Sequence, residues 1–239
     1  MTATVILPTT GAPELKDAIE SVLNQTYDTQ LYLVVDGEQH KYATDNIRRH
    51  PDWFWNERIK ICVLPENVGA NGFYGHRVYA AFTHLVNTDY VLYLDQDCWL
   101  EPTHVENCVN TIKQYDLEWT YSLRNIYSSD KEFICRDDCE SLGLWAPYTQ
   151  YNHIDTNCYC IKTEVATKIA SAWHGGWGQD RVFFNAMFQY FKKVKCAGQY
   201  TVNYRLGGNE GSVKSDFFLL GNKVTNQRYN GVFPWQKSS

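Results

Sequence analysis

The sequence predicts an α/β fold in which a mostly parallel, Rossmann-like central sheet carries helices on both faces. Two observations support this. Short apolar runs are typical of buried strands, and the stretches between them repeat their apolar residues at helical spacing. Strands are expected at 3–8, 31–37, 59–64 and 90–94, and helices at 13–25 and 71–86. Because strands alternate with helices, right-handed crossovers and a doubly wound sheet follow.

The elements follow one another in a regular order. The first strand, ATVILP, is a continuous apolar run that ends in proline, and the helix after it starts at Pro13, which a first helical turn tolerates. The second strand stops at Asp36 and Gly37, and the third precedes the glycine-rich loop PENVGANG. Residues 41–58 carry mixed helical signals, and the helix at 71–86 leads into the fourth strand.

Polar side chains follow the expected strands at the point where each strand ends. Thr9 and Thr10 follow the first strand, Asp36 the second, and Asn67 lies in the loop after the third. Ligands of such sheets bind beyond the carboxyl ends of the strands. An acid such as Asp36 can accept hydrogen bonds from a ribose or a base, and capping of the turn at Gly37 explains it equally well. The chain has no GxGxxG and no GxxxxGK[ST] motif, so neither a nicotinamide cofactor nor a P-loop is supported.

The stretch DYVLYLDQDCWLEP, residues 89–102, leads an apolar strand into two carboxylates. Because side chains alternate along an extended chain, Asp95 and Asp97 point the same way, with Gln96 between them. Two like charges at the end of a buried strand are tolerable mainly when a divalent cation neutralises them. The competing interpretation is an exposed acidic turn before a helix that Pro102 opens.

Six motifs, taken together, resemble the GT-A glycosyltransferases of the large family 2 type. They are ILPTT, AIESVLNQTY, VVDG, ENVGANGFYGHR, YLDQDCWLEP and WGQDRVFF. They are similar to the strand-end proline motif, the first helix, the nucleotide-reading acid, the Asn-x-Gly loop with a nearby basic residue, the DxD motif and the late catalytic acid of that family. The resemblance implies a nucleotide-sugar donor, a Mn²⁺ or Mg²⁺ ion, and usually inversion at the anomeric carbon.

The resemblance also implies roles for single residues. Asp97 is the expected direct metal ligand, and Asp95 is expected to contact the metal, a metal-bound water or the ribose. Asp180, at the start of an expected helix, is the implied catalytic base, although an acid favoured by the helix dipole is a common alternative. The residues expected to contact the nucleotide-sugar are Pro8, Thr9, Thr10, Asp36, Asn67, Arg77, Asp95 and Gln96.

Further candidates lie on the acceptor side. Asp155, in the segment HIDTN, could bind hydroxyl groups of the sugar or acceptor, or pair with a nearby lysine. Trp173 and Trp177 flank a glycine pair and suit a rim that stacks on sugars, and a core or interface role is about as well supported. His76, beside Arg77, is a weaker candidate for contact with the diphosphate.

The family often supplies a third metal ligand, commonly a histidine, after the catalytic acid. This chain has no histidine after His174. The loop RLGGNEGSV could close over the donor instead, and its candidate residues are Arg205, Asn209 and Ser212.

The composition indicates which binding partners and which cellular compartment are expected. The net charge is −5 without a basic run, so binding to nucleic acid is not expected. No apolar run approaches the roughly 20 residues of a membrane helix, and MTATVIL is interpreted as a core strand rather than a signal sequence. A cytoplasmic protein whose eight cysteines are free thiols is therefore expected.

The sequence thus predicts one GT-A domain over 1–239, with a nucleotide-sugar-binding half (1–100), an acceptor-side half with a small antiparallel excursion (101–206) and a C-terminal lid or tail (207–239) that could pack on a second subunit. The expected activity is metal-dependent transfer of a hexose from a UDP-sugar to the hydroxyl group of a carbohydrate or another acceptor. The alternatives are a catalytically inactive carbohydrate-binding derivative and a sugar nucleotidyltransferase. The latter usually carries Arg and Lys in the first loop, where this chain has Thr-Thr-Gly-Ala.

Overall fold

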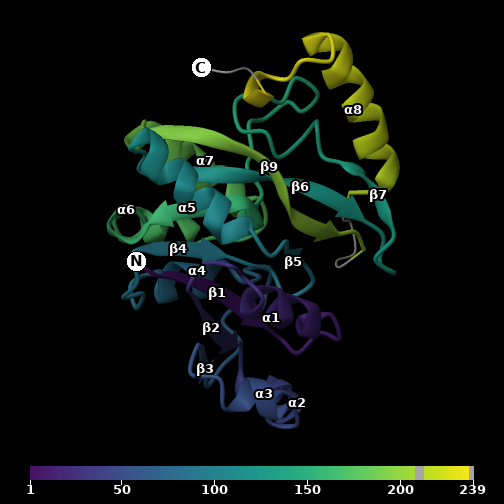
Figure 1. Ribbon diagram of the computed structural model, residues 1–239. Helices are drawn as coiled ribbons and strands as arrows, with labels where there is room; N and C mark the ends of the chain where they lie inside the picture. The colour runs from purple at the N-terminus through teal and green to yellow at the C-terminus, as the bar shows by residue number, and fades with distance from the viewer. Residues whose placement is uncertain (208–212, 237–239) are drawn as a thin grey trace.

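The computed structural model describes residues 1–207 and 213–236. One nine-stranded sheet runs through it in the order β3-β2-β1-β4-β8-β6-β9-β5, with β7 paired to β6 (Figure 1). The strands are β1 (Ala3–Thr9), β2 (Thr29–Val35), β3 (Ile59–Val63), β4 (Tyr90–Tyr93), β5 (Trp99–Leu100), β6 (Trp119–Tyr127), β7 (Phe133–Arg136), β8 (Tyr159–Lys162) and β9 (Val194–Arg205). The helices are α1 (Leu15–Leu23), α2 (Tyr42–Arg48), α3 (Pro51–Phe54), α4 (His76–Thr83), α5 (His104–Tyr115), α6 (Thr163–Ile169), α7 (Gln179–Tyr190) and α8 (Ser215–Tyr229).

The first half of the sheet is parallel, as the alternation of strands and helices predicts. Strand β1 pairs in parallel with β2 and with β4, and β2 pairs in parallel with β3. All seven residues of β1 and all four of β4 are buried, because helices such as α1 and α4 cover the sheet. The carboxyl ends of these strands therefore lie at one edge of the sheet, and the predicted α/β fold is confirmed.

The second half of the sheet is mixed. Strand β8 lies antiparallel to both β4 and β6, and β6 is parallel to the long strand β9. The predicted excursion at 128–153 contains β7, which pairs antiparallel with β6, and an antiparallel bridge between Gly143 and His153. This pairing brings the acceptor-side segments beside the carboxyl end of β4.

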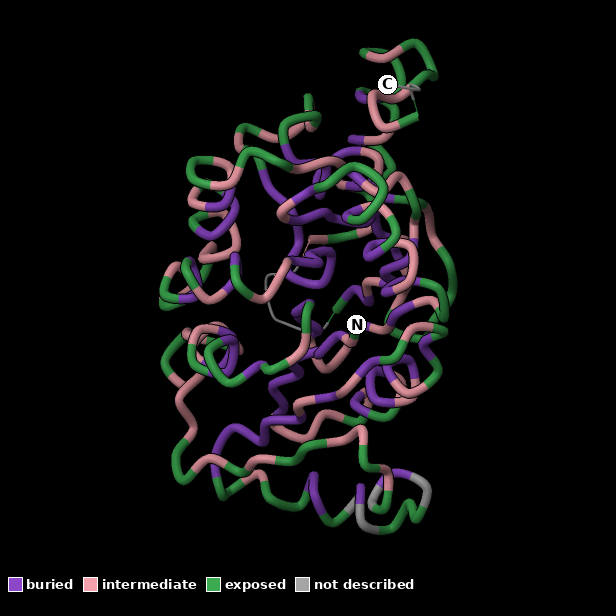
Figure 2. Tube along the Cα trace, turned by 60° about the vertical axis from the view of Figure 1, so that its left-hand side comes forward, coloured by how far each residue is buried: buried purple, intermediate pink, exposed green. Residues whose placement is uncertain are grey.

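The core is continuous across the sheet. One large cluster of buried apolar side chains reaches from β1 and β2 to Trp119, Phe183 and Val202 of the second half. Figure 2 shows the buried segments along the middle of the molecule, with exposed segments around them. The continuous sheet and core therefore fix the positions of the two halves relative to each other.

The helix expected at 71–86 starts later than predicted. Asn71, Gly72 and Tyr74 have positive φ values of 60°, 83° and 52°, which a right-handed helix excludes. Helix α4 consequently begins at His76. The residues before it form a compact loop.

The C-terminal segment forms the 15-residue helix α8, which lies beside β7 (Figure 1). Its Phe218 is completely buried and forms a second, smaller cluster with Ile126, Cys139 and Leu206. Gly221 allows this close packing, since a Cβ there would lie 2.6 Å from Cys139 Sγ. Phe218 thus anchors α8, whereas the candidate loop residues Asn209 and Ser212 lie outside the described residues.

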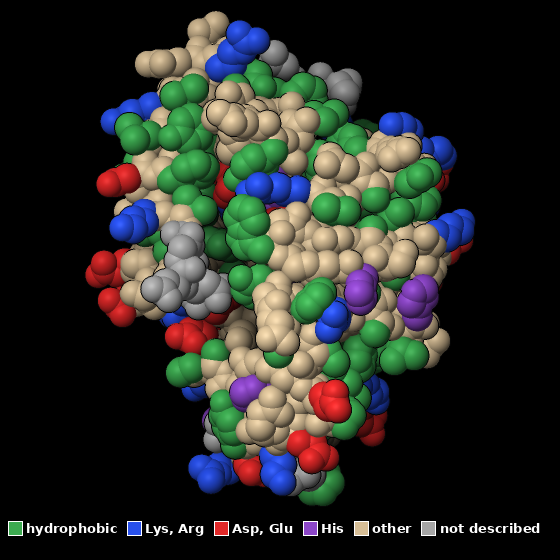
Figure 3. All heavy atoms as spheres, turned by 180° about the vertical axis from the view of Figure 1, so that it is seen from behind, with side chains coloured by type: hydrophobic (Ala, Val, Ile, Leu, Met, Phe, Trp, Pro, Cys, Tyr) green, Lys and Arg blue, Asp and Glu red, His purple; other side chains and the backbone are tan. Residues whose placement is uncertain are grey.

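Several expectations about composition agree with the structure. All eight cysteines are free thiols. None of the helices in the described part of the chain has the length and apolar character that a membrane crossing needs. Among the described residues on the face shown in Figure 3, basic side chains lie scattered among acidic and polar ones and form no extended basic patch.

We expect Phe218→Ala to lower the free energy of unfolding by about 3 to 5 kcal/mol, because it empties the small cluster under α8. Leu220→Ala on the same helix is the matched control, since Leu220 is 55% exposed. Urea denaturation of both variants measures the difference. Equal losses would show that Phe218 does not anchor the helix.

Candidate active site

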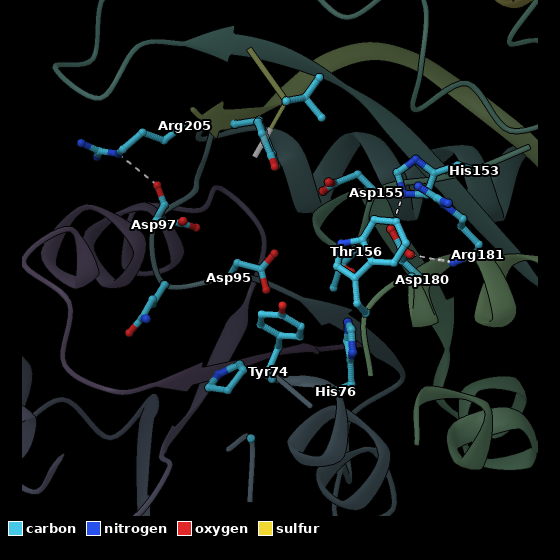
Figure 4. A pocket seen from close by; sticks show the side chains of 18 of the residues that line it. Tyr74, His76, Asp95, Asp97, His153, Asp155, Thr156, Asp180, Arg181 and Arg205 are labelled. Atoms are coloured by element: carbon cyan, nitrogen blue, oxygen red, sulfur yellow. Dashed lines mark hydrogen bonds and ion pairs between the residues drawn. The ribbon is translucent and has the colours of Figure 1, made fainter. Parts of the chain in front are cut away.

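A cavity of about 750 Å³ opens at the carboxyl ends of β1 and β4, between the two halves of the sheet. The parallel half contributes the strand-end residues and the DxD loop, and the second half contributes residues 140–156 and the start of α7. Figure 4 shows Asp95 and Asp97 on one side of this cavity and Asp180, His153 and Arg181 on the other. Nearly all of the sequence-predicted site residues therefore meet in one place.

Gln96 ties the end of β1 to the DxD loop. Its side-chain oxygen accepts hydrogen bonds from Thr9 Oγ1 at 2.7 Å, from the Thr10 backbone N–H at 3.0 Å and from that of Ala12 at 3.3 Å. Pro8, Thr9, Thr10 and Gln96 all line the cavity. The Gln96 carboxamide thus fixes the positions of two strand ends that face the ligand space.

Asp36 holds the loop after β3. It is only 3% exposed, and its two carboxylate oxygens accept hydrogen bonds from the Val68 and Gly69 backbone N–H groups, each at 2.8 Å. Gly69 is required there, because a Cβ would lie 2.1 Å from the Tyr74 carbonyl oxygen. Asp36 and Asn67 line the cavity, and Asn67 Oδ1 has no hydrogen-bond partner among the described residues.

Arg77 and His76 occupy different positions from those favoured by the sequence. The Arg77 guanidinium stacks on the Phe73 ring, 3.3 Å from its centroid, and donates to the Val68 carbonyl oxygen. Arg77 is not among the described residues that line the cavity, whereas His76 is. Arg77 therefore packs against the 67–75 loop, and His76 lines the cavity.

The two aspartates of the DxD motif are both half-buried. Tyr79 donates to Asp95 Oδ1 at 2.7 Å, and the Asn157 side chain donates to Asp95 Oδ2 at 3.0 Å. Burial, together with the charge of Asp97, raises the pKa of Asp95 to about 7. Burial also raises the pKa of Asp97, which makes fewer hydrogen bonds than Asp95. Both carboxylates line the cavity, and a bound cation would offset the free-energy cost of placing their two negative charges there.

Arg205 fixes the DxD loop from the end of β9. Its guanidinium donates to the Asp97 carbonyl oxygen at 3.1 Å, to the Ser129 carbonyl oxygen at 3.0 Å and to Asp17 of α1 at 2.6 Å. Arg205 lines the cavity, so this member of the predicted closing loop lies at the site. Its hydrogen-bonding capacity is directed mainly at the protein.

Asp180, at the start of α7, forms an ion pair with His153. Asp180 Oδ2 lies 2.5 Å from His153 Nε2, and Oδ1 accepts the Arg181 backbone N–H at 2.8 Å. The Asp180 side chain is 25% exposed and that of His153 is 6% exposed, so the carboxylate is the more accessible of the two, although both residues line the cavity. Burial alone would raise the pKa of Asp180, but the hydrogen bond and charge of His153 lower it.

His153 is held in its charged form by the same contact. Burial opposes the charge, yet the hydrogen bond to Asp180 and its charge raise the pKa of His153 above the ordinary value. His153 Nδ1 is buried and has no hydrogen-bond partner among the described residues. The ion pair orients one Asp180 oxygen and leaves the other side of the carboxylate toward the cavity.

Arg124, from the middle of β6, lies among three carboxylates beneath the acceptor side. It pairs with Asp137 at 2.7 Å, with Asp155 at 2.6 Å and with Glu140. These surrounding charges hold the pKa of Arg124 well above its ordinary value despite its complete burial. Asp155 lines the cavity and pairs with this arginine, not with a lysine.

The two predicted rim tryptophans differ. Trp173 is completely buried and stacks on Phe183 with ring centroids 3.9 Å apart, so the expectation that it forms part of the sugar-binding rim is corrected. Its neighbours in the core are aromatic, and burial of a large apolar ring decides its place. Trp177 is 77% exposed and lines the cavity, which suits a rim.

Comparison with known proteins gives one family. A model of glycosyl transferase family 2 matches residues 4–120. A segment of 58 residues is 38% identical to an uncharacterized protein of Haemophilus influenzae, covering 24% of this chain and 39% of that protein.

Solved structures of S. aureus TarS share the fold. TarS residues 1–349 superpose with a TM-score of 0.63 at 12% identity, covering 86% of this chain and 60% of TarS 1–349. The same TarS fragment in complex with UDP-GlcNAc gives a TM-score of 0.64 at 12% identity, covering 88% of this chain and 60% of the fragment. The chain thus spans about 60% of the length of these two structures.

The family match and the fold together identify the class. Residues 4–120 match glycosyl transferase family 2, and the fold is that of the GT-A glycosyltransferases. The match covers the parallel half with the strand-end residues and the DxD motif, and so five of the six motifs on which the resemblance rests; WGQDRVFF, at 177–184, lies outside it.

Sequence reasoning missed several residues of this cavity. His153 stands two positions before Asp155 in HIDTN, and side chains two apart on an extended chain share a face, which is a usable signal. Arg124 interrupts the otherwise buried strand WTYSLRNIY, and a charge in such a strand requires a partner. The partners Asp137 and Glu140 lie in irregular chain, so only the fold brings them together.

We expect His153→Gln to lower the free energy of unfolding more at about pH 5.5 than at about pH 9. The raised pKa of His153 gives stabilisation that is complete below about 6.5 and is lost as the pH rises through the raised value. The lowered pKa of Asp180 gives stabilisation that is lost only as the pH falls through its lowered value, below about 3.9.

Urea denaturation at the two pH values measures this difference. His84→Gln is the matched control, because His84 is exposed on the surface. A His153→Gln penalty that is the same at both pH values would argue against the ion pair.

Proposed function

We propose that the protein transfers a hexose from a UDP-sugar to an acceptor hydroxyl group, with inversion at the anomeric carbon. One observation carries this proposal: Asp95 and Asp97 face Asp180 across a single cavity at the strand ends. A nucleotide-sugar lying between them would present its diphosphate to one side and its anomeric carbon to the other. The UDP-GlcNAc bound by the structurally similar TarS fragment supports the choice of donor.

The nucleotide half of the proposal rests on the parallel strand ends. Pro8, Thr9, Thr10, Asp36 and Asn67 line the part of the cavity next to β1 and β2. Because Gln96 and Asp36 already anchor their own loops, the surface they form is pre-organised before a donor binds. The unpartnered Asn67 Oδ1 and the remaining lone pairs of Asp36 are the acceptors available to a base or ribose.

The DxD pair fits Mn²⁺ or Mg²⁺. Two half-buried carboxylates one residue apart, both with raised pKa, form a site where positive charge is favoured, and both ions prefer oxygen ligands. Asp97 would hold the ion directly, because Tyr79 and Asn157 already occupy both oxygens of Asp95. Bound there, the ion would act as a Lewis acid toward the leaving diphosphate. No group of three or more His, Cys, Asp or Glu side chains in the described part of the chain could hold a metal, so water and the diphosphate would complete the coordination.

Asp180 is the proposed base. Its carboxylate would take the proton of the acceptor hydroxyl while the acceptor oxygen bonds to the anomeric carbon and the bond from that carbon to UDP breaks. The ion pair with His153 keeps Asp180 ionised and aimed at the cavity, at the cost of basicity. Attack from the side opposite the leaving group produces inversion.

The alternatives are less well supported. A sugar nucleotidyltransferase would need cationic side chains in the loop after β1, and residues 9–12 contain none. A catalytically inactive derivative would have no need to keep Asp95, Asp97 and Asp180 around one cavity. The cytoplasmic location and the possible homodimer remain predictions from the sequence.

Asp97→Asn should remove the metal-dependent part of UDP binding. We expect Mn²⁺ to strengthen UDP binding to the unmodified protein by roughly tenfold or more, and to have little effect in the variant. Calorimetric titration with UDP, in Mn²⁺ and in chelator, measures this. Asp28→Asn, at an exposed position, is the matched control. Equal UDP affinity with Mn²⁺ and with chelator in the unmodified protein would reject the metal site.

Asp180→Asn should lower transfer by roughly 10² to 10⁴, since the amide keeps the size of the side chain but loses its basicity. UDP release from a panel of UDP-sugars, with simple sugars as acceptors, measures the rate, and NMR of the product reports its anomeric configuration. UDP affinity should persist in the variant. Undiminished transfer, or retention of the donor configuration, would contradict the mechanism.

A further inference from the structure

Arg181 lies beside the proposed base and faces the cavity. It follows Asp180 in the first turn of α7 and lines the cavity on the side opposite Asp97 (Figure 4). The diphosphate of a donor held at the DxD motif would thus lie across the cavity from it. Arg181 is placed to meet the acceptor.

Two aromatic rings hold the Arg181 guanidinium. Its central carbon lies 3.5 Å from the centroid of Tyr151 and 5.0 Å from that of Trp177. Stacking covers the faces of a guanidinium and leaves its N–H groups, which lie in the plane, free to donate. Arg181 Nε is buried and has no hydrogen-bond partner among the described residues. The group is thus oriented while part of its donor capacity is unused.

The other cationic side chains around the cavity already have partners. Arg124 pairs with three carboxylates, Arg205 pairs with Asp17, and His153 pairs with Asp180. Among the described residues that line the cavity, Arg181 is the one arginine whose guanidinium makes neither an ion pair nor a hydrogen bond within the protein. Its charge is therefore available to a ligand.

The acidic residues nearby do not remove that availability. Glu140 and Asp155 bind the guanidinium of Arg124, which they share with Asp137, and the carboxylate of Asp180 pairs with His153. The backbone N–H groups at the start of the 12-residue helix α7 add positive potential at the same place. An anion here would gain a guanidinium and a helix N-terminus, whereas Glu140, Asp155 and Asp180 already accept hydrogen bonds from partners of their own.

We propose that Arg181 binds an anionic group of the acceptor, a phosphate or a carboxylate, close to the hydroxyl that is glycosylated. This inference rests on the proposed function, because it takes Asp180 to mark the position of the acceptor hydroxyl. Arg181 forms bidentate hydrogen bonds to the anion, and Trp177, at the exposed rim, covers the acceptor. The acceptor is thereby an acidic hydroxyl compound and not a neutral sugar.

The test compares matched ligands of the UDP-loaded protein. Glucose, glucose 6-phosphate and glucuronate are titrated into protein saturated with UDP and Mn²⁺, and binding is followed by calorimetry or ligand-observed NMR. We expect glucose 6-phosphate, glucuronate or both to bind roughly tenfold or more tightly than glucose, since a charge-assisted pair is involved. The two anions separate a phosphate from a carboxylate site.

Variants identify the residue responsible. Arg181→Gln should abolish the preference for the anion, and Arg181→Lys should keep part of it, because lysine retains the charge without the planar fork. Arg228→Gln on α8 makes the same change in net charge at an exposed position and should keep the preference. Circular dichroism and the unfolding midpoint verify that each variant is folded.

Three results would overturn the inference. They are equal binding of glucose and both anions, an unchanged preference in Arg181→Gln, and an equal loss of glucose and anion binding in that variant, which would mean that Arg181 only packs the rim. Failure of UDP itself to bind is a separate result, because the UDP titration comes first, and it would count against the proposed function.

Discussion

Burial of carboxylates beside one another is the constraint that shapes this cavity. Asp95, Asp97, Asp155 and Asp180 all reach it, and each would be strongly disfavoured in its charged form without a partner. Asp155 has Arg124 and Asp180 has His153, both placed within hydrogen-bond distance. The DxD pair has only neutral donors, and burial together with the charge of Asp97 raises the pKa of Asp95 to about 7. The negative charge of Asp95 and Asp97 is therefore the charge that a bound cation would compensate.

The sheet connects the two halves of the molecule that contribute residues to the cavity. Strand β4 pairs with β1 on one side and with β8 on the other, so the parallel nucleotide half and the mixed acceptor half share a strand. Asn157, just before β8, donates to Asp95, and its backbone N–H also binds Asp155. Arg205 at the end of β9 reaches both the DxD loop and Asp17 of α1. The two halves of the cavity are consequently fixed relative to each other, which is the pre-organisation that the proposed group transfer requires.

The contacts also explain which residue positions could be predicted from the sequence. Asp36, Asp95 and Asp97 follow strands directly, and parallel strands end at a common edge, so their convergence follows from local pattern alone. Trp173 and Trp177 are only four residues apart, yet one stacks on Phe183 in the core and the other is 77% exposed. No local signal separates them, because burial depends on which elements pack over the loop. Arg77 and His76 present the same difficulty, since only the direction in which α4 starts decides which of them faces the cavity.

The sequence by itself determined the α/β class, the strand ends that form the donor side, and the presence of a late acid at a helix start. Those features depend on hydrophobic period, on turn residues and on side-chain alternation, all of which act within a few residues. Tertiary structure alone decided that His153 meets Asp180, that Arg124 gathers Asp137, Glu140 and Asp155, and that Arg181 stands between Tyr151 and Trp177. Except for the contact between Arg181 and Trp177, these contacts join residues 13 to 31 positions apart. Their geometry is set by the antiparallel insertion of β8 between β4 and β6, which no local pattern encodes.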